Sequence, residues 1–152
     1  MKFEFTHAFP IPLKKGFDYL DDFRTWPDWY NGMIEIIEPA LAKWIAPGDE
    51  VRWTYRLLGR KLEGKSVLES RVDGEFVVFT TKVEGLPEIH WEYRYAEAGP
   101  EAFVLKVVME AEETTSFFGK VIERTLLPKM IERDLRTSLE NLDHIFAMSL
   151  FA

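Results

Sequence analysis

The feature that most constrains the fold is a series of short segments in the middle of the chain, followed by one long segment with helical spacing. In most of the short segments apolar and polar residues alternate, and a period of two indicates strands with one buried face. The segments are residues 33–37, 51–57, 61–69, 76–83, 89–95 and 103–111. Turn sequences such as Val72-Asp73-Gly74 separate them, which indicates hairpins. The sequence therefore predicts an antiparallel sheet.

The N-terminal part predicts a further strand and two short helices. Residues 2–9 alternate like the later strands. From Leu13 the apolar residues recur at helical spacing. We expect this helix to end near Trp26-Pro27, because proline pushes the preceding residue out of the α region. The residues that follow predict one more helical turn, closed by Gly32.

The C-terminal part predicts the longest helix, over residues 128–148, and a shorter one before it, over residues 116–126. Pro128 separates them because it lacks a backbone donor and clashes with the preceding turn. The apolar stripe of the long helix contains Ile131, Leu135, Leu139, Leu142, Ile145 and Phe146. We therefore expect a single α+β domain over residues 1–152, in which an antiparallel sheet of about six to seven strands wraps around the long helix.

Composition excludes several classes of partner. The net charge of −7 leaves no basic stripe for a phosphate backbone, so we expect no nucleic acid to bind. No segment is long and apolar enough for a transmembrane helix, and no signal peptide is seen. Together with the absence of cysteine, this predicts a cytoplasmic protein. The histidines lack ligand spacing and no cofactor motif occurs, so neither a metal site nor a cofactor is expected.

Aromatic residues make up 14% of the chain, and many fall on the strand face that we assign to the interior. Those on the inner face of two strands are Trp53, Tyr55, Trp91, Tyr93 and Tyr95. Buried hydroxyl and indole N–H groups need partners, so these side chains suit a pocket wall better than a plain core. Gly64 and Ser66 share this face and are expected to leave room, and Met109 lies on the inner face of the last strand.

Other candidate residues have two interpretations each. His7 shares a strand face with Phe5 and Phe9. It is either a half-buried residue bonded to a neighbour or a general acid or base near neutral pH. Trp26 and Trp29 flank a proline and form either a packing plug at the end of the sheet or a gate.

Two stretches of sequence carry a family resemblance. They are Trp26-Pro27-Asp28-Trp29 and Ser138-Leu139-Glu140-Asn141-Leu142. With the order of elements, they resemble the START-related superfamily, which has the helix-grip fold and includes polyketide cyclase/dehydrase and lipid-transport proteins. The resemblance covers essentially the whole chain. It implies a deep cavity between the sheet and the long helix, entered near the short helices and the hairpin loops.

The expected ligand-binding residues come from the inner strand face and from the edge of the C-terminal helices that would face the cavity. They are His7, Trp53, Tyr55, Ser66, Trp91, Tyr93, Tyr95, Met109, Phe117, Val121, Met130 and Ile131. Methionine is included because its side chain adapts to varied ligands. No diagnostic set of catalytic residues is found.

Three functional hypotheses remain open. The first is a carrier or sensor of a small hydrophobic or aromatic molecule, such as a lipid, a quinone or a polyketide-like compound. The second is a polyketide cyclase/dehydratase-type enzyme in which cavity tyrosines and His7 transfer protons. The third is a protein-interaction module with a vestigial cavity. It would use the outer face of the sheet or its apolar tail, residues 149–152, which would dock on its own domain or on a second subunit of a homodimer.

Overall fold

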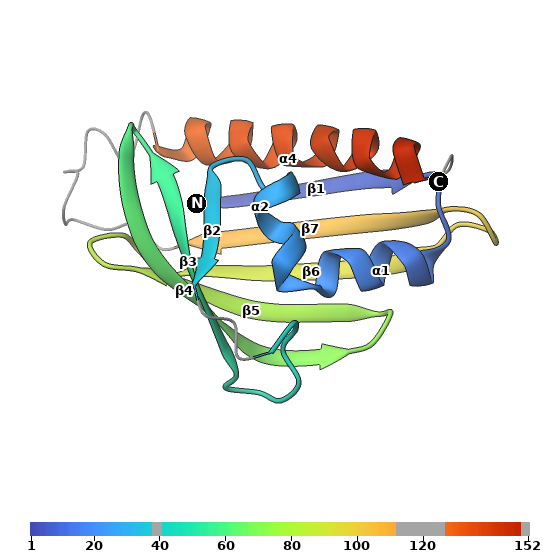
Figure 1. Ribbon diagram of the computed structural model, residues 1–152, viewed down its shortest axis with the longest axis horizontal. Coiled ribbons are helices and arrows are strands. Elements are labelled where there is room, and N and C mark those ends of the chain that lie inside the picture. Colours follow the sequence, from blue (N-terminus) through green and yellow to red (C-terminus); the bar gives the residue numbers. More distant parts are fainter. Residues whose placement is uncertain (38–40, 112–126, 150–152) are drawn as a thin grey trace.

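The computed structural model describes residues 1–37, 41–111 and 127–149, and its main feature is one curved antiparallel sheet (Figure 1). The sheet has seven strands in the order β1-β7-β6-β5-β4-β3-β2, with antiparallel neighbours throughout. The strands are β1 (Lys2–Phe9), β2 (Met33–Ile37), β3 (Glu50–Leu57), β4 (Arg60–Val72), β5 (Phe76–Val83), β6 (Ile89–Glu97) and β7 (Phe103–Ala111). The predicted sheet is confirmed. β4 is longer than predicted because it continues to pair with β5 beyond a register shift between Leu68 and Ser70.

The long C-terminal helix, α4 (Leu127–Ser149), runs along β1 on the concave side of the sheet (Figure 1). Its buried side chains recur at helical spacing and belong to the main core. They are Ile131, Leu135, Leu139, Leu142 and Phe146. The predicted helix and its apolar stripe are confirmed, whereas the shorter helix predicted over residues 116–126 lies outside the described residues.

The segment between β1 and β2 differs from the predicted pair of helices. It consists of α1 (Leu13–Asp21), a 3₁₀ turn η1 (Phe23–Thr25) and α2 (Trp26–Trp29). Asp22 is extended and its carboxylate accepts a hydrogen bond from Arg24 N at 2.9 Å, which ends α1 and caps the next turn. Pro27 occupies the first turn of α2, where no intrahelical donor is needed. Trp26-Pro27 therefore begins a helix instead of ending one.

Phenylalanine side chains fill the space between α1 and the sheet without room to spare. The rings of Phe9 and Phe103 lie 5.2 Å apart, and Phe146 of α4 meets Phe9 edge-on at 5.1 Å. A Cβ atom at Gly16 would lie 2.1 Å from the Phe103 ring. Only glycine therefore allows α1 to approach β7 this closely. This end of the molecule is solid core.

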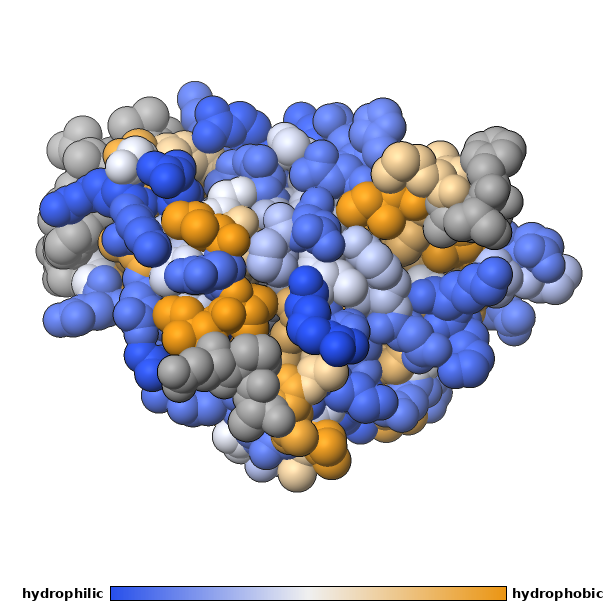
Figure 2. All heavy atoms as spheres, viewed as in Figure 1, coloured by the Kyte–Doolittle hydropathy of each residue, from blue (hydrophilic) through white to orange (hydrophobic). Residues whose placement is uncertain are grey.

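The surface seen in Figure 2 is mostly hydrophilic, with apolar residues over β2 and the loop before β3. Ile34, Leu41 and Ile45 are among the exposed large apolar residues. Scattered apolar side chains of this kind are normal on protein surfaces. None of the described helices is long and apolar enough to cross a membrane.

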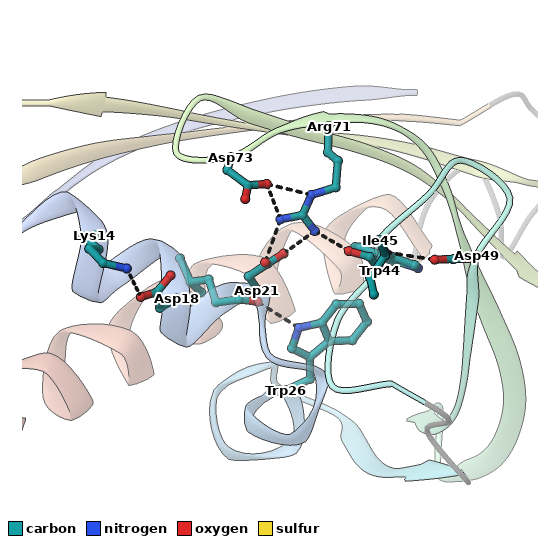
Figure 3. Close-up of polar contacts among 10 residues, drawn as sticks. Lys14, Asp18, Asp21, Trp26, Trp44, Ile45, Asp49, Arg71 and Asp73 are labelled. Carbon is teal, nitrogen blue, oxygen red and sulfur yellow. Dashed lines mark hydrogen bonds and ion pairs between the residues drawn. The ribbon is translucent and has the colours of Figure 1, made fainter.

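A buried ion pair joins α1 to the sheet (Figure 3). Arg71 of β4 donates from Nη1 to Asp21 Oδ1 at 3.0 Å and from Nη2 to Asp21 Oδ2 at 2.8 Å. Only 8% of the Arg71 side chain and 4% of the Asp21 side chain are exposed. Arg71 also donates to the Trp44 carbonyl at 2.7 Å and to Asp73 at 2.8 Å. One guanidinium therefore holds α1, the loop before β3 and the β4–β5 turn together.

We expect Asp21→Ala to lower the free energy of unfolding by about 3 kcal/mol, because it leaves the buried guanidinium without its bidentate partner. Asp18→Ala, one turn earlier on the same helix, is the matched control. It removes only the exposed pair with Lys14, which is 2.9 Å long. That loss should be about 0.5 kcal/mol or less. Denaturant unfolding measures both, and equal losses would contradict a structural role for the buried pair.

Candidate ligand-binding cavity

A cavity lies on the concave side of the sheet. It is bounded there by α2, the residues that follow α2 and the start of α4. Its volume is about 90 Å³, which is room for several water molecules. It is lined by Met1, Trp26, Trp29, Tyr30, Met33, Trp53, Tyr55, Leu57, Leu62, Ser66, Phe79, Thr81, Val83, Leu86, Pro87, Ile89, Trp91, Tyr93 and Ile131. None of the described side chains that line it is charged. Within the described ranges, no group of three or more His, Asp or Glu residues is placed to hold a metal ion.

Aromatic rings form much of the cavity wall. Phe79 and Trp91 pair across β5 and β6, and their rings lie 6.1 Å apart with 13° between their planes. Tyr30, which follows α2, meets Trp91 nearly edge-on at 6.2 Å and lies 6.1 Å from the Tyr55 ring. These contacts bring α2, β3, β5 and β6 around one space. The resulting flat apolar surfaces suit the packing of a ring or another rigid apolar group.

Ser66 provides a polar patch on the β4 side of the cavity. Its Oγ accepts a hydrogen bond from Trp53 Nε1 at 3.0 Å and shares another with Thr81 Oγ1, also at 3.0 Å. Ser66 and Thr81 are opposite each other in the β4–β5 register. Only one of the two hydroxyl protons occupies the bond between them. The second can point to water or to a ligand.

Tyr55 and Asp134 connect the cavity to α4. The Tyr55 hydroxyl donates a short hydrogen bond to Asp134 Oδ2, and Asn31 Nδ2 donates to Asp134 Oδ1 at 2.8 Å. Asp134 is only 4% exposed, so this buried carboxylate has a donor on each oxygen. Burial, followed by the hydrogen bond to Asp134, raises the pKa of Tyr55 well above its usual value. The phenol is therefore protonated at neutral pH.

The other two tyrosines that line the cavity are also neutral. Burial raises the pKa of Tyr93 well above 10.0. Burial also raises the pKa of Tyr30, and the proximity of Tyr55, Tyr93 and Asp134 adds to that shift. The three hydroxyls therefore act as uncharged hydrogen-bonding groups across the physiological pH range.

One face of α4 holds the turn that carries Trp29 and Tyr30. Ser138 Oγ accepts from the backbone N of Asn31 at 2.8 Å and donates to the Asp134 carbonyl at 2.6 Å. One turn further along, Asn141 Nδ2 donates to the Trp29 carbonyl at 3.0 Å. These side-chain contacts fix the backbone of the turn, and thereby the rings that it directs toward the cavity.

Trp29 differs from neighbouring tryptophans in its hydrogen bonding. It is 3% exposed and lines the cavity, yet its Nε1 is buried and has no hydrogen-bond partner in the part of the chain that the structure describes. By contrast, Trp26 Nε1 donates to the Leu20 carbonyl at 3.0 Å, and Trp53 Nε1 donates to Ser66. Buried donors without an acceptor are rare in folded proteins. The unpaired Trp29 donor is therefore a local cost of this packing, because its nitrogen is fully buried.

Two rings of the cavity wall lie close to the backbone at glycine residues. A Cβ atom at Gly64 would lie 2.6 Å from the Trp53 ring, so the expectation that Gly64 leaves room was wrong: Trp53 occupies that space. Gly32 has φ +95°, and a Cβ there would lie 2.6 Å from the Tyr55 ring. The position of Gly32 requires glycine both for its backbone and for this close approach.

The structure brings part of the predicted ligand-binding set to the cavity. These residues are Trp53, Tyr55, Ser66, Trp91, Tyr93 and Ile131. Met130 is half-buried against the core and does not belong to the lining. Phe117 and Val121 lie outside the described residues.

His7, Tyr95 and Met109 lie away from the cavity. Tyr95 sits beneath α1, where Phe17 meets its ring edge-on at 4.9 Å. Met109 is 0% exposed and is part of the main core. His7 Nε2 lies 2.8 Å from both carboxylate oxygens of Asp143 on α4. His7 therefore fits the interpretation as a half-buried residue bonded to a neighbour.

Several residues at the cavity were not predicted from the sequence. Phe79 and Thr81 lie opposite Trp91 and Ser66 in the sheet register, so pairing the predicted strands would have found them. Asp134 could have been suspected because its carboxylate directly precedes Leu135 of the apolar stripe on the long helix. Tyr30 had no comparable signal, because its position depends on where α1 ends.

Comparisons with known proteins place this fold among solved structures. The protein TTHA0849 from Thermus thermophilus is 14% identical, with 98% of this chain and 99% of that chain covered and a TM-score of 0.78. The Zhui aromatase/cyclase from Streptomyces sp. R1128 is 13% identical, with 99% and 95% covered and a TM-score of 0.77. A START superfamily protein from Mycobacterium smegmatis is 10% identical, with 97% of each chain covered and a TM-score of 0.75. At these identities the likeness shows the fold alone.

The sequence itself matches a known family over nearly its whole length. No curated protein matches the chain. The family described as polyketide cyclase / dehydrase and lipid transport matches residues 1–146. This agrees with the START-related resemblance seen in the sequence. The chain therefore belongs to the polyketide cyclase/dehydrase and lipid-transport family.

Proposed function

We propose that this protein binds a small, neutral, hydrophobic molecule in the cavity and acts as its carrier or sensor. The observation that carries the proposal is an aromatic-walled cavity whose lining also contains the hydrogen-bonding hydroxyls of Ser66 and Thr81. Small-molecule sites typically combine apolar walls with a few placed polar groups.

The charges around the cavity favour a neutral ligand. None of the described side chains of the lining is charged, and one of them, Tyr55, is bonded to the buried Asp134 carboxylate. An anionic ligand would lose its hydration without gaining a cationic side chain from the lining, and it would face the field of Asp134. Neutral aromatic or alicyclic molecules avoid both costs.

The family supports a hydrophobic ligand of this kind. Its description combines cyclases, dehydrases and lipid transport. Among similar structures are the Zhui aromatase/cyclase and StfQ, a di-domain ARO/CYC of the steffimycin biosynthetic pathway. This chain is 12% identical to StfQ and covers 52% of it. These names make polyketide-like aromatic compounds reasonable members of a ligand panel.

A cyclase-type enzyme is the second candidate, and the contact between Tyr55 and Asp134 favours it. A phenol that reaches the cavity and is bonded to a buried carboxylate is one arrangement able to donate or relay a proton. His7 lies too far from the lining to share this role directly, because its ring bonds to Asp143 at the other end of α4. The third hypothesis is an interaction module that uses the outer face of the sheet or the apolar tail, of which residues 150–152 lie outside the described part.

Ligand binding predicts a rise in melting temperature. We expect a one-ring compound such as phenol or p-cresol, at about 10 times its Kd, to stabilise the protein by about 1.4 kcal/mol, or roughly 3–6 °C, and oleate to have little effect. A small probe is chosen because the cavity volume is about 90 Å³. Differential scanning fluorimetry measures the shift.

A pair of valine variants tests whether the cavity is responsible. Val83 is half-buried in the lining, so Val83→Trp should block the cavity and abolish the shift. Val72 is 41% exposed and outside the lining, so Val72→Trp should keep it. A shift that survives in Val83→Trp, or the absence of any shift across the panel, would rule out binding in this cavity.

If the protein is instead an enzyme, Tyr55→Phe should lower kcat by about 10²–10⁴-fold while ligand affinity stays within about threefold. Asp134→Asn should act in the same direction through Tyr55. Tyr95→Phe, which removes a buried hydroxyl outside the cavity, should leave kcat unchanged. Cyclisation of a linear aromatic polyketone thioester, followed by mass spectrometry, provides the rates. Unchanged rates in both Tyr55→Phe and Asp134→Asn would exclude this pair from catalysis.

A further inference from the structure

Two tyrosines of the cavity lining differ in what their hydroxyl groups can still do. The Tyr55 hydroxyl donates to Asp134 Oδ2, so its oxygen can only accept a further hydrogen bond. The Tyr30 hydroxyl has no hydrogen-bond partner among the described residues. Burial raises the pKa of Tyr30 well above its usual value, so this hydroxyl keeps its proton at neutral pH and can donate it to a bond. The pair therefore offers one acceptor and one donor.

The Tyr30 hydroxyl is accessible, unlike the indole N–H of Trp29. In the part of the chain that the structure describes, Trp29 Nε1 and Thr54 Oγ1 are the side-chain polar atoms that are fully buried without a partner. The Tyr30 hydroxyl is not one of them, and Tyr30 is half-buried in the cavity lining. An unpaired hydroxyl that keeps accessible surface can bond to water or to a ligand.

The Tyr30 and Tyr55 hydroxyls lie in the same part of the cavity. Their rings are 6.1 Å apart, without a direct hydrogen bond between these two described side chains. Burial raises the pKa of Tyr30 most, and the nearby Tyr55 and Tyr93 raise it further. Both of these residues line the cavity from the inner face of the sheet. The Tyr30 hydroxyl is therefore directed toward the inner face of the sheet.

This arrangement selects the polar group of a ligand. A hydroxyl can accept from Tyr30 and donate to Tyr55 at the same time, whereas a carbonyl oxygen only accepts and a methyl group does neither. A ligand group that displaces water from this position loses affinity if it cannot form the same bonds. The cavity volume of about 90 Å³ limits the apolar remainder of the ligand to one small ring.

We infer that Tyr30 and Tyr55 form a recognition site for the hydroxyl group of a small one-ring ligand, in which Tyr30 Oη donates to the ligand oxygen and Tyr55 Oη accepts from it. This inference rests on the proposed function and specifies the class of ligand. Asp134 is a positioning residue in this site, because it holds the Tyr55 proton. Asn31 Nδ2, which donates to the other carboxylate oxygen at 2.8 Å, keeps Asp134 in place.

Three probes of one ring each test the inference. Phenol and toluene are nearly equal in size and differ by a hydroxyl and a methyl group. We expect the unmodified protein to bind phenol about tenfold more tightly than toluene, as one to two added hydrogen bonds would give. Benzaldehyde should bind about threefold more weakly than phenol, because it gives Tyr55 no donor. Isothermal titration calorimetry measures the three affinities.

Tyr30→Phe and Tyr95→Phe form a matched pair of variants, since each removes one hydroxyl and keeps the ring. Tyr95 is buried beneath α1 and outside the lining. The preference for phenol over toluene should fall to about threefold or less in Tyr30→Phe and stay near tenfold in Tyr95→Phe.

The possible outcomes separate this inference from the proposed function. Equal affinities of the unmodified protein for phenol and toluene would overturn the inference and leave the proposed function intact. A tenfold preference that persists in Tyr30→Phe would also overturn it. Benzaldehyde binding as tightly as phenol would overturn the role of Tyr55. Binding of none of the three probes would count against both proposals.

A second readout does not depend on a variant that folds. The ¹³Cζ resonance of a tyrosine responds to hydrogen bonding of its hydroxyl. In the unmodified protein the Tyr30 and Tyr55 resonances should move more with phenol than with toluene, whose ring is alike. The Tyr95 resonance should respond equally little to both compounds. Identical responses of Tyr30 to phenol and toluene would contradict the assigned bond.

Discussion

The cavity depends on the polar contacts between α4 and the turn after α2. Apolar burial holds a helix against a sheet but does not fix its position, because the hydrophobic effect is not directional. Asp134, Ser138 and Asn141 supply that direction by bonding Asn31 and the Trp29 carbonyl. Because Asp134 is buried and bonded at both oxygens, moving the helix along the sheet would leave a carboxylate without its donors. The same contacts position the rings of Trp29 and Tyr30.

The two ends of the space under α4 differ in the chemistry of their aromatic residues. Toward α1 the rings are mainly phenylalanine, and the contact between Gly16 and Phe103 leaves no void. Toward the β5–β6 turn they are mainly tryptophan and tyrosine, and the cavity lies there. Phenylalanine has no polar atom to satisfy and can be packed solidly. Tryptophan and tyrosine need partners, and a space open to water or ligand provides them.

Much of this arrangement could be predicted from the sequence, because strand periodicity reports which face a residue occupies. It placed Trp53, Tyr55, Trp91 and Tyr93 on the inner face correctly. It could not report how far along the strand the cavity extends, so Tyr95 was grouped with them although it lies under α1. His7 shows the same limit at the sheet edge, where the inner face meets α4 and Asp143. The positions of Trp29 and Tyr30 could not be predicted. They depend on the end of α1 at Asp22, which local propensity does not indicate.

The state of Tyr55 bears on the choice between a binding protein and an enzyme. General acids and bases work best when their pKa lies near the working pH. Burial and the bond to Asp134 move the pKa of Tyr55 upward, away from neutrality. The Tyr55 O–H donates a hydrogen bond to Asp134 Oδ2, and Asn31 donates to the other carboxylate oxygen, so a transferred proton has no prepared route onward. What remains is a phenol oxygen able to accept a hydrogen bond, in the same cavity lining as the Ser66–Thr81 hydroxyl pair, which has one proton left to donate. This combination favours the proposal of a binding protein over that of an enzyme.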